Sequence, residues 1–461
     1  MALTSAELAL IARHEADLAY RSGKDELMWR YYRGRQRVEQ LGMAIPPSMR
    51  RFLVIANWCR TYVDTINDRQ QVRSFIVPGD DTANPRLEEI AAASNFPAHL
   101  AMFNTDRMVY GRAFMSVGAN MDEPSLPWIR VESPREMSAF VDVVSERITS
   151  AARIYGAADN SNDPQARYVT LMTPDSTVWA ERVGGKWVES ARDVHKLGQV
   201  PVVMHLNRRM SGDWNGESQL TDLIPLVDGT ARSLTNLQFA QEAHGIPRMF
   251  MTGVSKGDFI DADGKPIPMF EAYFDAIHML TKSDAKVGQL SAADLKNFET
   301  SLTIYGKQAS VITGFPARYW GLTTANPPAE GAIHADEAGL VRSVEAQNEQ
   351  LGVSLGWVGA LALRIATGSW PSGNRVFLDW FDPATPTVSQ REDALAKRKA
   401  AGVLSREGYW DELGWSESRK AKEREYMRRE ALEADPYAVI LAAKDAAAKV
   451  AADASATPVV G

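Results

Sequence analysis

The spacing of apolar residues changes twice along this chain, and those changes constrain its fold more than any single motif does. Residues 4–42, 48–68 and 85–110 place apolar side chains three and four positions apart, which predicts amphipathic helices. Residues 110–207 instead break into short segments rich in β-branched and aromatic residues, separated by Gly, Pro, Asn and Asp. Such segments predict an antiparallel meander. Helical spacing returns near residue 216, so the pattern predicts an α+β fold.

The second half of the chain is predominantly helical. The expected elements are, in chain order, a helix over 216–245, a compact insertion over 246–292, a helix over 293–313, a loop over 314–328, a helix over 328–367, a strand at 374–383 and helices over 388–450. From Ala451 onward the tail lacks the apolar content to fold alone and is expected to be disordered.

Composition excludes several classes of protein. The 461 residues are 45% hydrophobic and 24% charged, which is typical of a globular chain with more than one domain. The single cysteine, Cys59, excludes an internal disulfide framework and a cysteine-based zinc cluster, and it suits the cytosol. The sequence contains no run of about 18 apolar residues, so no membrane span is expected. The N-terminus lacks the features of a secretory signal. The net charge of −7 argues against a protein whose affinity depends on neutralising phosphates.

His334, Asp336 and Glu337 form the most obvious candidate chemical site. On a helix His334 and Glu337 share a face, whereas Asp336 points away from His334. A zinc helix of the His-Glu-x-x-His type needs a second histidine four residues on, and position 338 is alanine. The acids are therefore better explained as early helix residues that favour the positive N-terminal end.

The segment "DADG" over 261–264 is similar to the start of a calcium-binding loop. Such a loop needs a glutamate at its twelfth position, and counting from Asp261 that residue is Ala272. We therefore interpret the segment as a turn, and we predict no metal site.

The motif "YYRGRQ" over 31–36 mixes aromatic rings with arginines. This combination suits single-stranded nucleic acid or phosphate. The preferred interpretation is a helix end terminated by Gly34, with the aromatic rings packed beneath it.

The chain has no motif typical of a nucleotide-binding or nucleophilic enzyme. GxGxxG, Walker A, GxSxG and CxxC patterns are all missing from the sequence. We therefore predict no cofactor and no catalytic residue.

The order of elements, together with local motifs, resembles the portal protein of tailed double-stranded DNA bacteriophages. The matching segments are "WRYYRGRQ" (29–36), "NWCRTYVDTINDR" (57–69), "VYGRAFMSV" (109–117), "GESQLTDLIPLVDGTARSLTN" (216–236), "AKVGQLSAADLKNF" (285–298) and "TGFPARYWGLTTANPPAEGAIHADEAGL" (313–340). Their order and spacing over residues 28–345 carry the resemblance.

The resemblance implies a portal architecture with a mixed α/β wing, a helical stem, a small α/β clip and a helical crown. The implied parts are wing 1–215, stem helices 216–245 and 293–313, clip 246–292, tunnel loop 314–328, long helix and wing strand 329–385, crown 386–450 and tail 451–461.

Portal proteins form a ring, usually of twelve subunits, at one capsid vertex. The resemblance implies a virion protein that is assembled in the host cytoplasm and has no membrane partner. Double-stranded DNA would be packaged and ejected through the ring. Its implied partners are further copies of itself, the terminase large subunit, a head-completion or adaptor protein, and the major capsid and scaffolding proteins.

The resemblance also assigns three groups of site residues. The tunnel loop would face the DNA channel through Arg318, Tyr319, Trp320, Thr323, Thr324, Asn326 and Pro327. The stem would line the channel with Asp228, Glu242, Lys296, Glu299 and Lys307. The clip would dock the motor or adaptor through Lys256, Asp258, Asp261, Asp263 and Lys265.

Two physical features agree with a DNA conduit. Residues 217–313 hold twelve Asp and Glu against eight Lys and Arg, a net −4 that avoids gripping a sliding phosphate backbone. The segment "LGWVGALALRIA" in the third helix is too apolar for a solvated exterior, as expected of subunits that pack in a ring.

Two alternatives remain open at this point. One is a metal-dependent hydrolase that uses His334 and Glu337. The other is a different capsid-associated adaptor protein, in which the helices of 216–313 pack inside a monomer.

Overall fold

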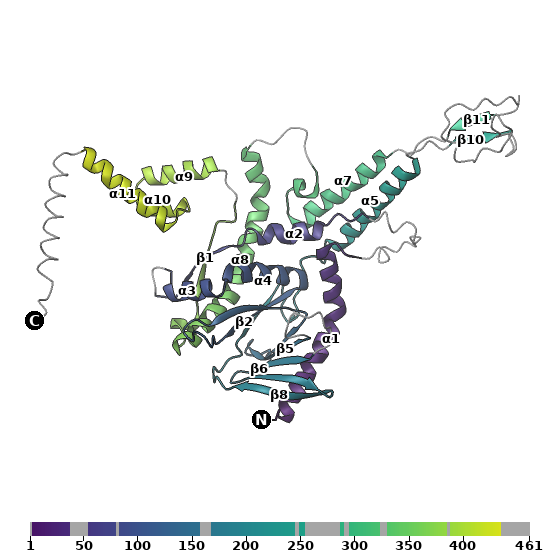
Figure 1. Cartoon of the computed structure of the whole chain (residues 1–461). Coiled ribbons are helices and arrows are strands. Elements are labelled where there is room, and N and C mark those ends of the chain that lie inside the picture. The colour runs from purple at the N-terminus through teal and green to yellow at the C-terminus, as the bar shows by residue number, and fades with distance from the viewer. Residues whose placement is uncertain are drawn as a thin grey trace, which may run out of the picture. The chain divides into compact units, whose positions relative to one another are not determined.

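The computed structural model describes most of the chain. The described residues are 2–36, 54–79, 83–156, 167–244, 249–253, 286–289, 295–322, 330–384 and 388–434. Contacts divide the chain into two compact units, Met1–Ala384 and Thr385–Gly461. Figure 1 shows that unit 1 combines helices with sheets, whereas the described part of unit 2 is helical, and the prediction of an α+β fold is confirmed.

The N-terminal helix α1, Ser5–Arg33, has a sequence-encoded cap at each end. The Thr4 side chain accepts a hydrogen bond from the backbone N–H of Glu7, and the Glu7 side chain accepts one from the backbone N–H of Thr4. These two hydrogen bonds form a capping box. Gly34 adopts φ 64° and ends the helix in the left-handed conformation. The interpretation of "YYRGRQ" as a helix end is therefore confirmed, and the expected extension to residue 42 is wrong for the residues that the structure describes.

Three shorter helices follow. Helix α2, Trp58–Asn67, is capped by the side chain of Asn57, so it begins later than the expected 48–68 segment. The expected helix over 85–110 is two helices, α3 (Pro85–Ala93) and α4 (Phe96–Tyr110), because Asn95 adopts φ 50° and interrupts the helical backbone.

The meander forms two antiparallel sheets. Strands β2 (Arg112–Gly118), β3 (Trp128–Glu132) and β9 (Val202–Leu206) pair in the order β3-β2-β9. Strands β4 (Met137–Val141), β5 (Ile148–Tyr155), β6 (Tyr168–Met172), β7 (Thr177–Val183) and β8 (Lys186–Asp193) pair in sequence order. Gly184 and Gly185, at φ 58° and 79°, form the hairpin turn between β7 and β8.

Two further strand pairs join segments distant in sequence. Strand β1 (Val72–Ile76) pairs antiparallel with β12 (Phe377–Trp380), which confirms the strand expected at 374–383. Strands β10 (Met249–Thr252) and β11 (Lys286–Gln289) also pair antiparallel and join the two ends of the 246–292 insertion.

Helix α5, Ile224–His244, begins eight residues later than the expected 216–245 helix. Pro225 offers no backbone N–H and is tolerated in the first turn alone, which places the helix start beside it. Gly216 has φ 66°, and a Cβ there would lie 2.1 Å from the carbonyl oxygen of Gly111, so this segment is packed against the start of β2. Residues 216–223 therefore form a tight connection and not a helix.

The other long helices agree with the sequence. Helix α7 spans Lys296–Thr313, the 3-10 helix η4 spans Ala317–Trp320, and α8 spans Glu330–Thr367, followed by η5, Ser372–Asn374. By length and composition alone, Ala335–Thr367 is the one helical stretch of the described residues able to cross a membrane, but half of its most apolar window is buried within the protein.

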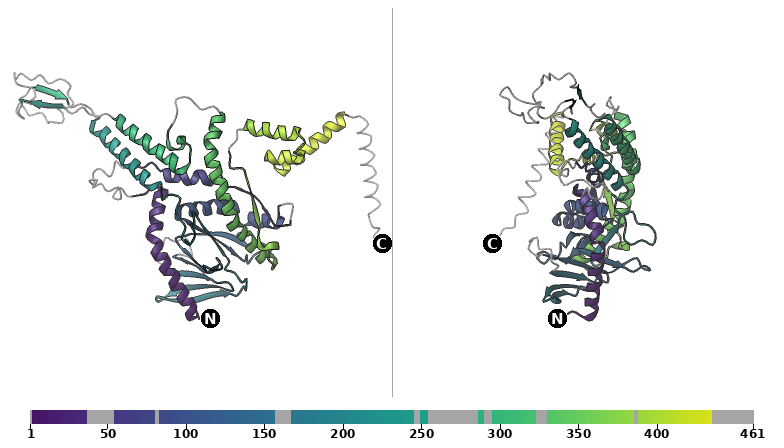
Figure 2. Two further views of the ribbon diagram at one scale, coloured as in Figure 1. Left: turned by 180° about the vertical axis from the view of Figure 1, so that it is seen from behind. Right: turned by 90° about the vertical axis from the view of Figure 1, so that its right-hand side faces the viewer.

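Helix α8 connects two hydrophobic cores of unit 1. Leu340 and Val344 are fully buried with residues of α1, α2, α4 and α5. Leu351 and Leu355, further along, are fully buried with residues of α3, α4 and the three-stranded sheet. The burial of this apolar face explains the hydropathy of α8, and the two views of Figure 2 show the helix running along one side of unit 1.

The described part of unit 2 is three helices, α9 (Val388–Ala400), α10 (Arg406–Glu412) and α11 (Glu417–Ala434). Trp410 is buried and stacks on Trp415 at a centroid distance of 5.7 Å. Lys420, itself buried, pairs with Asp411 and fastens α11 to α10.

Candidate functional site

Helices α5 and α7 lie side by side in unit 1, with the β10–β11 pair at their far end (Figure 1). Gly229 of α5 faces Tyr305 of α7, where a Cβ would lie 3.0 Å from the ring. This small residue lets the two helices approach closely. The pair is the part of the chain that the sequence assigns to the channel wall.

Asp228 of α5 is engaged within the chain. Its carboxylate accepts hydrogen bonds from the Tyr31 hydroxyl at 2.9 and 3.0 Å. Burial raises the pKa of this carboxyl above its usual range. The group fastens α5 to α1 and is half-buried, so its assignment to the channel wall stays a prediction.

Lys296, Glu299 and Lys307 lie exposed on α7. The backbone of Glu242 lies in α5, and its side chain is outside the described part of the chain. These four assignments stay predictions.

Helix α7 also exposes a stripe of apolar side chains. Ile304, Val311 and Ile312 are 54%, 77% and 44% exposed. Positions 304, 311 and 312 are seven and eight residues apart, so they share one face of the helix. Among the described residues, nothing covers this apolar face, and an exposed apolar surface is a candidate interaction site.

Trp320 of η4 is buried. Its ring is 3% exposed and packs at centroid distances of 5.5 Å from Trp58, 6.4 Å from Tyr62 and 6.0 Å from Phe315. Removing so large an apolar surface from water stabilises the core between α2 and η4. The prediction that Trp320 faces the DNA channel is therefore wrong.

Arg318 and Tyr319 are engaged by the first turns of α8. The Arg318 guanidinium pairs with Asp336 at 2.9 Å and with Glu337. The Tyr319 hydroxyl donates to Glu337 at 3.2 Å and accepts a hydrogen bond from Arg69 at 3.0 Å. The charge of Arg318 is therefore neutralised within the chain, which makes it a poor contact for a DNA backbone.

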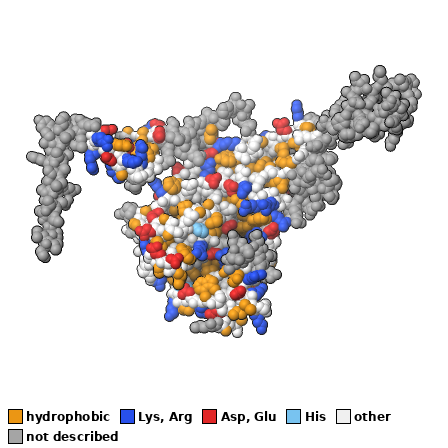
Figure 3. Space-filling view, viewed as in Figure 1, with side chains coloured by type: hydrophobic (Ala, Val, Ile, Leu, Met, Phe, Trp, Pro, Cys, Tyr) orange, Lys and Arg blue, Asp and Glu red, His pale blue; other side chains and the backbone are white. Residues whose placement is uncertain are grey.

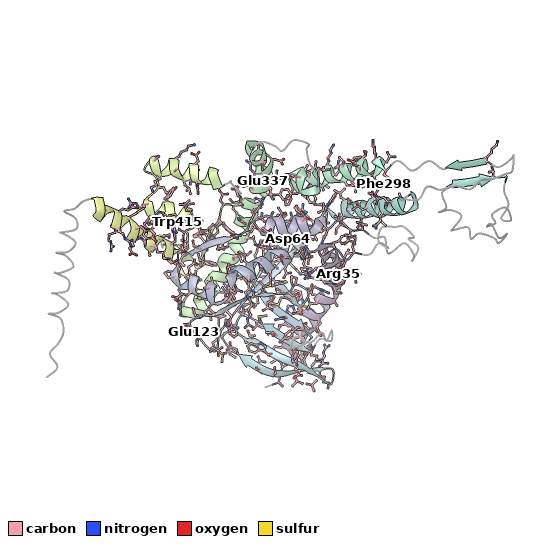
Figure 4. All side chains as sticks on the ribbon, turned by 45° about the horizontal axis from the view of Figure 1, so that its top comes forward. Arg35, Asp64, Glu123, Phe298, Glu337 and Trp415 are labelled. Atoms are coloured by element: carbon pink, nitrogen blue, oxygen red, sulfur yellow. The ribbon has the colours of Figure 1, made fainter. Side chains whose placement is uncertain are left out.

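Glu337, which Figure 4 labels, is the centre of this network. Its side chain is 8% exposed and lies 3.5 Å from the Arg69 guanidinium, in addition to its contacts with Arg318 and Tyr319. A carboxylate held by two guanidinium groups is already engaged within the chain. The arrangement gives no support to the hydrolase alternative.

Whether side chains are arranged to hold a metal ion can be judged only among the residues that the structure describes. Within them, no group of three or more His, Cys, Asp or Glu side chains is arranged to hold a metal ion. The side chain of His334 lies outside the described set, although its backbone is in α8.

Two groups of predicted site residues fall in undescribed segments. They are Thr323, Thr324, Asn326 and Pro327 of the predicted tunnel loop and Lys256, Asp258, Asp261, Asp263 and Lys265 of the predicted clip. The "DADG" turn at 261–264 is also outside the described residues.

Arg107 of α4 is a buried cation that sequence reasoning missed. Its guanidinium donates to side-chain carbonyl oxygens of four amides: Asn104, Asn207, Gln70 and Gln347. These amides come from α4, the end of β9, the segment after α2, and α8. Burial lowers the pKa of Arg107 to about 9. No sequence motif signals this group, because its partners are neutral and distant along the chain.

Cys59 is fully buried in the core of α2. Burial raises the pKa of its thiol to about 12, so the reactive thiolate is suppressed. The residue is therefore a core side chain and not a nucleophile.

Comparison with known proteins gives a consistent result. Residues 16–437 match the family model described as phage portal protein, SPP1 Gp6-like. The chain is 34% identical over 433 residues to the portal protein of Mycobacterium phage D29, covering 91% of this chain and 88% of the relative. It is 33% identical over 411 residues to the portal protein of Mycobacterium phage L5, covering 87% and 83%.

Solved structures of gene transfer agent particles are also similar. A chain in the virion of a native gene transfer agent particle matches 78% of this chain and 89% of its own length, at a TM-score of 0.41 and 14% identity. A chain in the neck of the native particle, computed with C12 symmetry, gives the same values.

Proposed function

The chain belongs to the SPP1 Gp6-like family of phage portal proteins, and we propose that it is the subunit of a portal ring at one vertex of a phage capsid. Double-stranded DNA passes through this ring during packaging and ejection. The observation that carries the proposal is the family match over residues 16–437, which includes the wing sheets, both stem helices and α8.

The exposed stripe of α7 supports assembly into a ring. A closed ring uses two different faces of each subunit, and each face must be unsatisfied in the isolated chain. Ile304, Val311 and Ile312 form such a face, because these apolar side chains are exposed to solvent in the isolated chain. We propose a dodecamer, with this stripe against the neighbouring stem.

The charge of the stem and clip together supports a conduit that does not bind DNA tightly. Residues 217–313 carry twelve acids and eight bases, and a ring multiplies this excess of negative charge. Each phosphate neutralised by Lys or Arg strengthens binding and slows sliding. Lys296 and Lys307 are the exposed cations of α7, and we propose that they contact DNA transiently beside Glu299.

We assign the parts of the chain as wing, stem, clip, tunnel loop and crown within the boundaries given above. The clip, through Lys256, Asp258, Asp261, Asp263 and Lys265, docks the terminase large subunit and later a head-completion or adaptor protein. The wing contacts major capsid and scaffolding proteins. Of the tunnel loop, the segment with Thr323, Thr324, Asn326 and Pro327 is the part we assign to the DNA channel.

The proposed role is structural and without catalysis. The sequence has no phosphate-binding loop, so ATP hydrolysis is assigned to the docked motor. Because the chain belongs to a family of phage portal proteins, we place it in the virion. No step of the proposal needs a cofactor.

The test is direct imaging of the purified protein. Negative-stain electron microscopy and mass photometry at micromolar concentration should give rings with a central channel. A chain that stays monomeric, and that also fails to assemble when capsid proteins are co-expressed, overturns the proposal.

A second test separates loop from scaffold. Deleting 323–327 while keeping Arg318, Tyr319 and Trp320 should leave ring assembly intact and impair DNA packaging or retention. If rings fail to form, the loop is a subunit contact and its assignment to the channel is wrong.

A further inference from the structure

A large groove lies between α8 and β12 in unit 1. It has a volume of about 920 Å³. Three apolar side chains of its lining are widely exposed: Val353 at 68%, Phe377 at 54% and Phe381 at 46%. An exposed apolar surface of this kind marks an interaction site.

Acidic side chains surround these apolar groups. Glu345, Glu349, Asp379 and Asp382 line the groove, and Arg375 is the one base among its lining residues. Within the described residues, Glu345, Glu349 and Asp379 have no ion-pair partner. The occupant of the groove should therefore combine an apolar or aromatic surface with arginine or lysine.

The same unit carries a surface with that chemistry. We define the basic patch as Arg30, Arg33, Arg35, Arg60 and Arg135 around Trp29 and Tyr32. Trp29 lies between two guanidinium groups, those of Arg35 and Arg135, each 5.5 Å from its ring.

Part of the charge of the basic patch is free. Glu26 pairs with Arg30 and Arg135, and Asp64 lies 3.6 Å from Arg60. Arg33 and Arg35 are exposed, and no acid among the described residues pairs with either. Five arginines against two acids leave the patch at +3, and the groove, with four acids and one arginine, stands at −3.

The two surfaces lie on different sides of unit 1. Lys and Arg side chains gather over the C-terminal end of α1 on the face drawn in Figure 3, and Figure 4 labels Arg35 there. The right-hand view of Figure 2 shows α8 along the side that is turned away from the viewer in Figure 1. Two different surfaces with complementary charge are what a head-to-tail contact between identical chains requires.

We propose that the groove between α8 and β12 receives the basic patch of the neighbouring subunit, and that this contact joins subunits in the wing. Arginine suits both halves of the contact, since it pairs with carboxylates and stacks on aromatic rings such as that of Phe377. The ring of Phe381 already has the guanidinium of Arg73 of the same chain 5.8 Å from its centroid. The inference rests on the proposed ring and adds the wing surfaces that would close it. It also explains the exposed "YYRGRQ" arginines without any nucleic acid.

The test reverses the charge of each surface separately in the full-length chain. Variant one carries Arg33→Glu and Arg35→Glu, and variant two carries Glu349→Arg and Asp379→Arg. Neither should form rings alone, because every head-to-tail contact then brings like charges together. Mixed in equal amounts, they should form rings of alternating subunits, since each contact again pairs opposite charges.

Controls separate this contact from folding and from the proposed function. Lys186→Glu, at the exposed start of β8, should assemble as the wild type does. Circular dichroism checks that the variants fold, and Arg33→Gln with Arg35→Gln, a milder pair, should raise the concentration needed for assembly about tenfold.

The outcomes are distinct. If the wild type forms rings and both reversed variants also do, or if the folded variants do not complement each other, this contact is overturned and the portal assignment stands. If the wild type forms no ring under any condition, the proposed function fails and the contact with it.

Discussion

Arg318 and Glu337 form an ion pair that ties η4 to the second turn of α8, across a segment of the chain assigned to the tunnel loop. Arg69, which follows α2, reaches the same carboxylate at 3.5 Å. The acids that the sequence presents as helix-start residues therefore have a second role, which is to hold the 3-10 helix against α8. The network fixes the two ends of the proposed loop on the body of unit 1.

Glu337→Ala should destabilise unit 1 strongly. The side chain is 8% exposed, and its removal leaves the guanidinium of Arg69, itself 10% exposed, without this acid. Losing one partner of a buried pair costs about 3 kcal/mol of the free energy of unfolding. Asp336→Ala is the matched control, because Asp336 is 51% exposed and should cost less than about 1 kcal/mol. Urea denaturation measures both, and equal losses would contradict the assignment.

Two glycines of α8 should respond in opposite ways to alanine. A Cβ on Gly356 would lie 2.2 Å from the carbonyl oxygen of Val376, so Gly356→Ala forces α8 away from the β12 segment and should cost about 2 kcal/mol or more. A Cβ on Gly352 meets no atom closer than 3.9 Å, and Gly352→Ala should stabilise the helix by about 0.5–1 kcal/mol. Melting temperatures of the two variants check the prediction, which fails if they shift in the same direction.

The stability of unit 1 should fall on acidification because two histidines are buried as neutral groups. Burial lowers the pKa of His14 to about 4 and that of His205 to about 3. A neutral, buried histidine contributes its full stability above the unfolded pKa of about 6.5 and loses it as pH falls from there towards the folded pKa. Between pH 6.5 and 5 each group should cost about 2 kcal/mol.

His14 offers the way to isolate this effect. Its ring nitrogens lie 3.0 Å from the Ser138 hydroxyl and 3.1 Å from the Ser150 hydroxyl, which fixes α1 on the five-stranded sheet. His14→Asn should be less stable at pH 7 and should show a shallower loss between pH 7 and 5. Denaturation curves at the two pH values measure the difference, and an unchanged pH dependence would contradict the role of His14.

Cys59 should not react with thiol reagents in the folded chain. The side chain is fully buried and burial raises its pKa to about 12, so both access and thiolate are lacking. Ellman's reagent should modify it only after denaturation. Prompt modification of the native protein would show that the core around α2 opens readily, and Cys59→Ser should then abolish the signal.

The helix ends show which features of the fold can be predicted from neighbouring residues in the sequence. Thr4, Asn57 and Gly34 cap helices through contacts with residues a few positions away, so their roles can be predicted without a fold. The Gly184–Gly185 turn is local in the same sense. The start of α5 was predicted too early because the segment before Pro225 has helical spacing, while packing of Gly216 against Gly111 decides its conformation.

The candidate site was predictable in part only. The order of helices, sheet and loop can be read from the sequence and leads to the portal family. The orientations of Asp228 and Trp320 cannot, because Tyr31 and Trp58 approach them from elements far away in the chain. Polar and aromatic side chains look alike in a sequence whether they face a channel or a core.

By itself, the sequence determined the order and approximate extent of the helices and strands, since caps, turns and apolar spacing act over a few residues. Only the tertiary structure decided which charges are free. It engages Arg318 and buries Arg107 among amides, while none of the acids that the structure describes pairs with Arg33 or Arg35. The physical reason is that the energy of a charge depends on what surrounds it in space, and those surroundings are assembled from distant parts of the chain.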